Sequence, residues 1–332
     1  MEKKNSLSHK LVGIVPLITL IFITAMAGLV FRDKYFFSIA NIGNVFLKAA
    51  KNGGLLALGM TVVIICGEID LSVGAVFALS GVVMGIVAQL NPWLGLLAGI
   101  SVGLVSGLLS GWLVAKLKIS SWIVSLAMLF AWRGVCMIIA KRSVRISSSL
   151  RFASYNFRCN LPGLQIKIPL FIIIFLVLTI VFSFLMHSTR YGLQLYAVGG
   201  NKEAARMMGL NVAKIKFLAF LISGIIAALA GILLASSSGS ASLSAGNMYE
   251  TYAIAMCAIG GVKLSGGYGS VLGTFSGVLI YFVINTIFTY LPSSISVHWQ
   301  SVLMGVLVLI SVASQSEVLN KWHINIKVGK RN

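Results

Sequence analysis

The chain is dominated by long apolar segments, each about as long as a lipid bilayer is thick. Ten of them follow one another, with short polar stretches between: 11–31, 42–66, 71–90, 93–117, 119–140, 168–187, 215–236, 249–262, 270–291 and 298–314. A helix that crosses a bilayer needs about 20 predominantly apolar residues. Of the 332 residues, 58% are hydrophobic and only 10% are charged, far from the composition of a soluble domain. We therefore predict an all-α polytopic membrane protein, a single transmembrane domain over 1–332 with about ten transmembrane helices.

Positive charge at both ends of the chain predicts its orientation. Three lysines precede the first apolar segment, and residues 321–331 are basic again. The N-terminus also resembles a signal peptide with a small-residue site at 25–27, but the apolar run is longer than a typical signal sequence has. Lysine and arginine collect in cytoplasmic loops, and an even number of spans returns the chain to its starting side. Both termini are therefore expected in the cytoplasm.

One polar segment does not follow this charge rule. Residues 141–167 contain six cations and no acid: Lys141, Arg142, Arg145, Arg151, Arg158 and Lys167. The ten-helix count places the segment outside the cell, where the positive-inside rule expects few cations. Two explanations stay open. Either one helix is miscounted, or the segment is a long outer loop whose cations bind an acidic partner.

Composition and motif content exclude several classes of function. A net charge of +19 would suggest nucleic-acid binding in a soluble protein, but loops and anionic headgroups account for it in a membrane protein. The four cysteines and four histidines are scattered, without the spacing of a metal site or a nucleophilic triad. The chain lacks the Gly-x-x-x-x-Gly-Lys-Ser/Thr motif of P-loop ATPases. We predict that it is not an enzyme, binds no nucleic acid and needs no metal or cofactor.

The first polar interruption lies between two strongly apolar segments. Its polar and glycine residues are Gly67, Glu68, Asp70, Ser72 and Gly74. Charge inside a membrane costs about 2.5–3.5 kcal/mol per residue, so the two acids are candidates for a function. The interruption has two interpretations: an N-terminal cap for the next helix, or a polar site on a translocation path. One residue can serve both.

A second glycine-rich interruption, residues 260–269, repeats the spacing of the first. Both contain Gly-x-x-x-Leu-Ser-x-Gly, which places Ser265 where Ser72 stands in the first. Glu250 lies shortly before, in an apolar segment short enough to predict a broken or re-entrant helix. Paired glycine interruptions in the two halves of a membrane protein suggest internal repeats around a transport path. Ser265 and Glu250 are therefore further candidates for that path.

The third polar segment, residues 188–212, is predicted to contain a short helix. Asn201 suits its N-cap and Gly209 suits its C-terminal stop. Ala204 and Ala205 lie between them, and their small side chains permit close approach of another surface. The segment is either a plain connection between two spans or a helix that binds a cytoplasmic partner.

Together these motifs resemble the membrane permease subunits of ribose-type sugar ABC importers, which include ribose, arabinose, galactofuranose and autoinducer-2 permeases. The matching runs are 67–74, the Ala-x-Gly-Gly-Asn-x-x-Ala-Ala-x-x-x-Gly run at 197–209, and Glu250-x-x-Ala-Ile-Ala with the glycines of 260–269. The resemblance extends from about residue 40 to 315. It implies a permease that imports a monosaccharide, a pentose or hexose such as ribose or galactofuranose.

The resemblance also implies partners and residue roles. A second permease subunit, a cytoplasmic ABC ATPase and an extracytoplasmic sugar-binding protein would complete the importer in a bacterial plasma (inner) membrane. The residues that would couple to the ATPase are Gly199, Asn201, Ala204, Ala205 and Gly209. The residues that match the family's polar break beside the path are Gly67, Asp70, Leu71, Ser72 and Gly74. The cationic segment 141–167 departs from the pattern expected of close relatives.

Aromatic and charged side chains elsewhere add further candidates for the path. Trp122 and Trp132 offer aromatic faces to a sugar, although membrane tryptophans more often anchor at the interface. Arg133 either lines the path or extends to the surface. The rival functions are an ABC permease for another small solute (autoinducer-2, a nucleoside or a branched-chain amino acid) and a proton-coupled transporter that uses the intramembrane acids.

Overall fold

Helices make up nearly all of the structure, a computed structural model that describes residues 2–161, 164–291 and 298–314. Helices occupy all ten predicted segments: α1 (Glu2–Val30), α2 (Ile39–Ala49) with α3 (Leu55–Ile65), α4 (Val73–Val87), α5 (Pro92–Ala115), α6 (Ser121–Ile139), α7 (Leu170–Ser188), α10 (Val212–Ser238), α11 (Tyr249–Ile259), α12 (Val271–Tyr290) and α13 (His298–Ser314). Within the described residues, six helices are long and apolar enough to cross a membrane. The all-α membrane fold is therefore confirmed, and the count of ten crossings stays a prediction.

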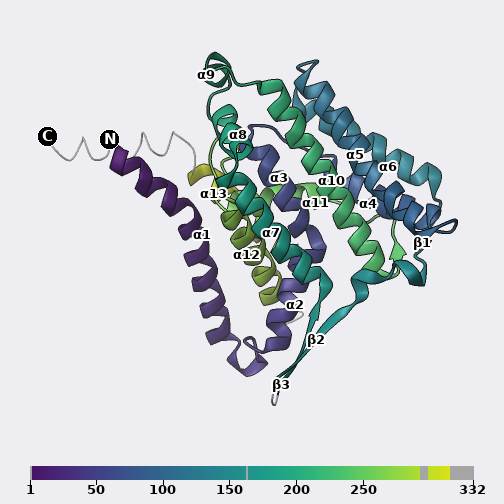
Figure 1. Ribbon diagram of the computed structural model, residues 1–332. Helices are drawn as coiled ribbons and strands as arrows, with labels where there is room; N and C mark the ends of the chain where they lie inside the picture. The colour runs from purple at the N-terminus through teal and green to yellow at the C-terminus, as the bar shows by residue number, and fades with distance from the viewer. Residues whose placement is uncertain (1, 162–163, 292–297, 315–332) are drawn as a thin grey trace.

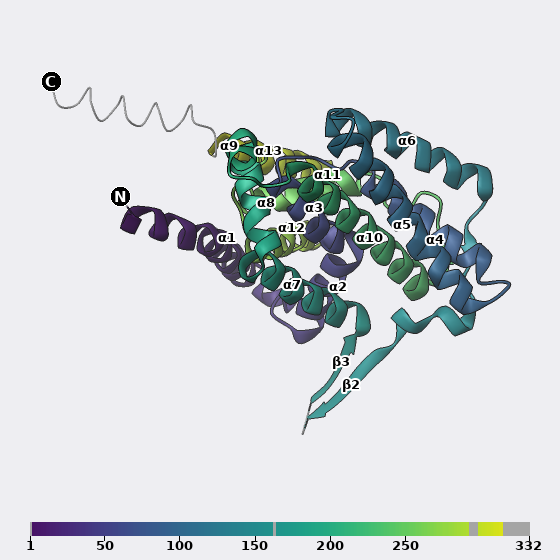
Figure 2. The same cartoon turned by 45° about the horizontal axis from the view of Figure 1, so that its top comes forward.

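The central packing contact joins α10 to α5, and small residues make it possible. Glycines at every fourth position of α5 face α10: Gly99, Gly103, Gly107 and Gly111. A methyl group on Gly107 would lie only 2.7 Å from the Cα of Leu221. Such glycine spacing lets two helix backbones approach closely, which drives helix association in a lipid environment. Helices α4, α5 and α10 consequently pack into one body, seen side by side in Figures 1 and 2.

The bundle has two distinct ends. At one end lie the short helices α8 (Arg190–Gly200) and α9 (Lys202–Met207), and we call it the α9 end. At the other, β1 (Val144–Arg145) pairs with β4 (Ser240–Ala241), and β2 (Asn156–Leu161) forms a hairpin with β3 (Leu164–Pro169). We call this the hairpin end. Helix α10 connects the two, because it begins just after α9 and ends just before β4. The described part of the cationic segment lies at the hairpin end and forms only strands and 3-10 turns, so it adds no spanning helix.

Contacts of the first and last helices show which end each reaches. Lys34, just after α1, donates a hydrogen bond to the carbonyl of Tyr290 at 2.5 Å, at the hairpin end. Ser311 of α13 donates to the carbonyl of Ala258 at 2.5 Å, near the α9 end. Helix α1 therefore begins, and α13 finishes, at the α9 end. The predicted basic stretch 321–331 lies outside the described residues.

Three of the membrane segments are interrupted inside the bundle. Helix α4 has 15 residues and α11 has 11, about 22 and 16 Å of helix, whereas a bilayer core is about 30 Å thick. Between α2 and α3, Asn52 (φ −107°, ψ 50°) and Gly53 (φ +106°) break the helical backbone. Such breaks leave polar backbone within the protein, which membranes tolerate only where protein or a cavity surrounds it.

Candidate functional site

The turn between α3 and α4 places Asp70 in a closed polar setting. Gly67 opens the turn with a φ of +81°, a conformation that favours glycine. Asp70 is 2% exposed. Its Oδ1 accepts hydrogen bonds from the Ser72 backbone N–H (3.0 Å) and hydroxyl (2.6 Å), and its Oδ2 accepts one from the Ser223 hydroxyl of α10 (2.9 Å). Asp70 thus closes its own turn through Oδ1 and fastens that turn to α10 through Oδ2. Its contact with a solute stays a prediction.

The second acid of this turn, Glu68, forms an ion pair with Lys216 near the start of α10. The side chains are only 12% and 11% exposed, respectively. A buried charge needs a partner, so each residue holds the other in place. Lys216 was absent from the residues predicted from sequence. The sequence prediction considers only acids as intramembrane charges. A lysine within the apolar segment 215–236 is equally costly in a membrane and equally indicates a buried partner.

A second polar cluster joins α6 to the loop between β4 and α11. Arg133 of α6 points inward and donates from Nη1 to the carbonyls of Leu243 and Ala245, both at 2.9 Å. Its Nη2 donates to the carbonyl of Gly74 at 3.4 Å. Because a guanidinium carries five N–H donors and no acceptor, three converging carbonyls suit it well. Arg133 therefore fixes this loop against the start of α4.

Glu250 lies in the same cluster, directly against Gly74. A methyl group on Gly74 would collide with the Glu250 carboxylate and with the carbonyl of Gly246. Position 74 therefore requires glycine because the Glu250 side chain leaves no room for a Cβ atom. The backbone there does not have the positive φ that favours glycine. The structure thus brings together three predicted path residues, Gly74, Arg133 and Glu250, although they are far apart in the sequence.

The two glycine interruptions meet each other at the base of α9. Gly267 N–H donates to the carbonyl of Ile65 at 2.9 Å. A methyl group on Gly266 would lie 2.7 Å from the Cα of Gly67, and one on Gly267 would lie 2.6 Å from the N of Gly200. Both positions also have positive φ, +88° and +72°. We call this set of backbone contacts the glycine junction: Gly67, Gly199, Gly200, Gly266 and Gly267.

A tyrosine on α8 adds a side-chain link to the same junction. The hydroxyl of Tyr196 donates to the carbonyl of Gly269 at 2.8 Å. Burial raises the pKa of Tyr196 to about 12, so the hydroxyl keeps its proton at physiological pH. The exposed Ser265 lies in the same loop, one residue before the junction. Helix α8 is thereby held to the second interruption immediately before the chain enters α9.

Helix α9 has the caps that its sequence predicts. The side chain of Asn201 accepts a hydrogen bond from the Ala204 backbone N–H at 2.9 Å, which satisfies a free donor of the first turn. Gly209, with a φ of +82°, ends the turn that follows. The helix stands at the top of the bundle in Figure 1, beside the start of α10.

Of the residues predicted to couple to the ATPase, Asn201 and Gly209 are exposed, whereas the two alanines are covered. Ala205 is fully buried within its own chain, and Ala204 is half-buried. Met207 and Met208 are instead the most exposed apolar residues there, at 83% and 69%. Helical spacing alone does not reveal which face of a two-turn helix meets its own chain. Two exposed methionines are typical of an adaptable binding surface.

A cavity of about 800 Å³ lies between the kink of α2–α3 and helices α11, α12 and α13. Its polar and aromatic lining includes Asn52, Tyr249, Tyr252, Tyr281, Asn285 and Gln300. The Tyr249 hydroxyl donates to Asn52 Oδ1 at 3.2 Å. The ring of Tyr252 lies 6.1 Å from that of Tyr249 and 5.7 Å from that of Tyr281, measured between centroids. The cavity therefore offers aromatic faces beside amide groups.

Comparison with known proteins identifies the family. A family described as the permease component of branched-chain amino acid transport systems matches residues 45–312. The chain belongs to this family of permeases.

Individual relatives of the permease have more specific names. The ribose import permease of Bacillus subtilis is 38% identical over 82% of this chain and 83% of its own length. The ribose import permease of Escherichia coli is 32% identical over 83% and 86%, and its L-arabinose transport system permease is 37% identical over 80% and 79%. These relatives confirm the resemblance to ribose-type sugar permeases. No solved structure shows a significant match to the chain.

The two candidate tryptophans, Trp122 and Trp132, are not among the residues that line the tyrosine-lined cavity. Trp122 is 56% exposed on α6, which suits an anchor at the membrane interface. Trp132 donates from its indole N–H to the Ser106 hydroxyl of α5 at 2.8 Å, which joins the two helices. Their contact with a solute stays a prediction. Among the described residues, no group of three or more His, Cys, Asp or Glu side chains is placed to hold a metal ion.

Breaking the buried ion pair from one side is expected to destabilise the permease. Lys216→Met leaves Glu68 buried without a partner, which costs about 3–5 kcal/mol, whereas removing both charges leaves no unpaired charge. We expect Lys216→Met to lower the thermal unfolding temperature in detergent, and Lys216→Met with Glu68→Gln to recover most of the loss. Equal unfolding temperatures for the single variant and the wild type would show that the pair is not structural.

Proposed function

We propose that the permease is the membrane subunit of an ATP-driven importer of a monosaccharide, a pentose or hexose. The observation that carries the proposal is the tyrosine-lined cavity. Sugars are recognised by hydrogen-bonding groups that fix their hydroxyls and by aromatic faces that cover their apolar ring surface. Its volume of about 800 Å³ is typical of a ligand site. The names of the ribose and L-arabinose permeases support the same class of solute.

The proposal assigns a partner to each end of the bundle. A cytoplasmic ABC ATPase binds α9, so the α9 end and both termini face the cytoplasm of a bacterial plasma membrane. A sugar-binding protein delivers the solute to the hairpin end, outside. A second permease subunit, identical or related, completes the membrane part. The capped, outward-standing α9 and the matching ends of α1 and α13 support this orientation.

The mechanism is alternating access driven through the glycine junction. ATP binding in the partner moves α9, and the backbone contacts of Gly199 and Gly200 pass that movement to both glycine interruptions. The first interruption is fastened to α10 by Asp70 and Glu68, and the second connects α11 to α12, two helices that line the cavity. Movement of α9 therefore closes the cavity on one side of the membrane and opens it on the other.

The function is tested by uptake in proteoliposomes that contain the permease with its partner ATPase and binding protein. We expect labelled ribose or another monosaccharide to accumulate only with ATP and binding protein present. Uptake that persists without the ATPase and collapses with the proton gradient would instead indicate a proton-coupled transporter. Uptake of a nucleoside, autoinducer-2 or an amino acid but no sugar would assign another solute class.

Removing one amide from the cavity is expected to weaken transport. Asn285→Leu keeps the branched shape and the number of heavy atoms but removes both hydrogen-bonding groups, so a sugar hydroxyl loses its partner at a cost of about 1–3 kcal/mol. We expect sugar uptake at subsaturating concentration to fall by about tenfold, with the unfolding temperature nearly unchanged. Tyr252→Phe keeps the aromatic face and serves as a milder comparison in the same cavity. Wild-type uptake by Asn285→Leu would exclude this cavity from the path.

A further inference from the structure

The described part of the cationic segment forms a fixed platform at the hairpin end. Val144 of β1 pairs with Ala241 of β4, and the Ile146 N–H donates to the carbonyl of Gly239 at 3.0 Å. Further along, the Ala153 N–H donates to the Ser236 hydroxyl at 3.0 Å. Buried apolar side chains at 146, 150 and 153 add to these contacts. The cations of this segment are therefore displayed from a backbone anchored on the end of α10.

Two of its arginines border a hollow of about 580 Å³, which we call the arginine hollow. Arg145 and Arg151 line it together with the hydroxyl residues Ser147 and Ser148, and its floor is the end of α4 and Gly239. Arg151 lies directly over Gly239, since a methyl group there would be 3.2 Å from the guanidinium carbon. Guanidinium groups beside hydroxyls suit a carboxylate, which accepts paired N–H donors in a planar geometry.

No acid lies in the segment that carries the arginine hollow, and no described ion pair involves that segment. Residues 141–167 contain no Asp or Glu. Among the described residues, the ion pairs are Arg206 with Glu203 and Lys216 with Glu68, and neither involves this segment. Six cations in a segment that the ten-helix count places outside also oppose the positive-inside preference. Within the described residues, the chain supplies these arginines with no carboxylate, so they are available to one on another molecule.

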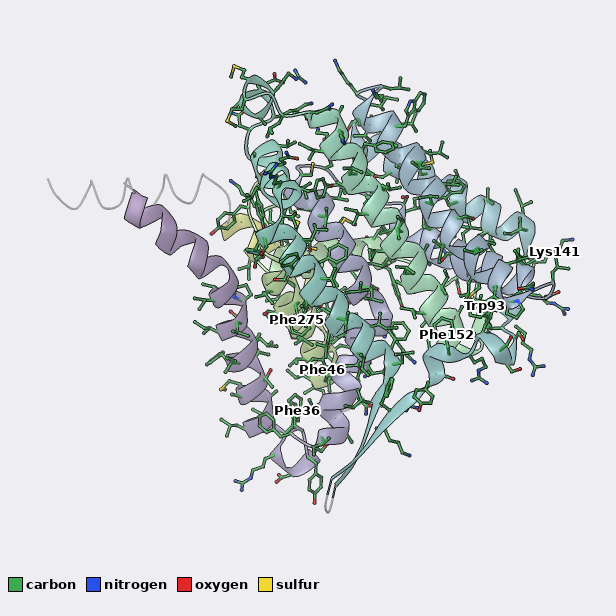
Figure 3. The ribbon with its side chains drawn as sticks, viewed as in Figure 1. Phe36, Phe46, Trp93, Lys141, Phe152 and Phe275 are labelled. Carbon is green, nitrogen blue, oxygen red and sulfur yellow. The ribbon has the colours of Figure 1, made fainter. Side chains whose placement is uncertain are left out.

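The position of the hollow favours a protein over lipid as the source of a counter-charge. Its floor is formed by the ends of α4 and α10, which lie in the interior of the bundle: 12 of the 15 residues of α4 are buried. Lipid headgroups surround the perimeter of a membrane protein, whereas the end of an interior helix faces the aqueous side. Figure 3 shows Lys141 and Phe152 of this segment at that end of the bundle.

We propose that the arginine hollow binds carboxylate side chains on the acidic docking surface of the solute-binding protein. This inference rests on the proposed function and adds the surface and the charge through which delivery occurs. It also accounts for the six cations of 141–167 on the outer side, because they attract an acidic partner and raise its rate of association.

The test measures binding of the importer's own solute-binding protein to the full complex in phosphatidylcholine nanodiscs. We expect Arg145→Glu with Arg151→Glu to weaken binding by at least about tenfold and to flatten its salt dependence between about 0.05 and 0.5 M NaCl. Lys116→Glu with Lys118→Glu is the matched control, because it makes the same change of charge at the α9 end. Arg145→Gln with Arg151→Gln tests loss of charge without reversal, and unfolding temperatures check folding.

Equal binding by the arginine variants and the control would overturn the inference while leaving the proposed function intact. Loss of the phosphatidylglycerol that co-purifies with the complex from the cell membrane, seen by native mass spectrometry of the arginine variants with unchanged protein binding, would overturn it in favour of a lipid site. Failure of every binding protein to bind the wild-type complex would instead contradict the proposed function itself.

Discussion

Gly199→Ala is expected to reduce ATP-driven sugar uptake by about tenfold or more, while the neighbouring Gly200→Ala leaves uptake near the wild-type rate. A methyl group on Gly199 would collide with the carbonyl of Ile65 and lie 2.6 Å from the N of Gly267. All of these are backbone atoms, which cannot rotate away. Overpacking of this kind costs about 1–3 kcal/mol. A methyl group on Gly200, by contrast, meets no atom within 4 Å.

The measurement is uptake and binding-protein-stimulated ATP hydrolysis in proteoliposomes, with the unfolding temperature recorded for each variant. We expect Gly199→Ala to retain its ATPase but to lose most of the stimulation, because the junction no longer carries the movement of α9. Gly266→Ala provides a second variant, since its added methyl would lie 2.7 Å from the Cα of Gly67 at a position with positive φ. Equal stimulation in Gly199→Ala and Gly200→Ala would refute transmission through the junction.

The fold was largely predictable because apolar length marks the part of each helix that lies in the bilayer. The bounds differ where polar residues prolong a helix. Helix α10 begins at Val212 rather than 215 because the Asn211 side chain caps it, accepting from the Lys214 N–H at 3.0 Å. The helix α8 was not predicted, since its residues lie outside any apolar segment and its Thr189 cap resembles an ordinary loop residue.

The candidate site was predictable only where one stretch of sequence contains it. The glycine interruptions and the capped α9 are local motifs, so their positions followed from spacing. The tyrosine-lined cavity is different, because Tyr249, Tyr252 and Tyr281 stand in apolar segments like any core residue and only packing brings them together. The pairing of Glu68 with Lys216 likewise depends on how α10 crosses the first interruption. Burial of Ala205 could not be read from helical spacing.

Charged substitutions at Met207 and Met208 are expected to detach the ATPase from an otherwise folded permease. Both side chains are exposed and apolar at the α9 end, and burying such residues in a partner's groove supplies much of the energy of a small interface. An aspartate there must be desolvated on binding without a matched partner. We expect Met207→Asp with Met208→Asp to weaken the complex by about 2 kcal/mol or more, about thirtyfold in Kd.

Co-purification of the ATPase and direct binding to the permease in nanodiscs measure this effect. Met207→Leu with Met208→Leu is the matched control, because it keeps apolar area at both positions and should retain the complex. Ala205 makes a poorer probe, since a larger side chain in its buried position would disturb α9 before it touched a partner. Full ATPase retention by the double aspartate variant would mean that the ATPase binds elsewhere. In that case α9 would not transmit ATP-driven movement to the glycine junction at its base.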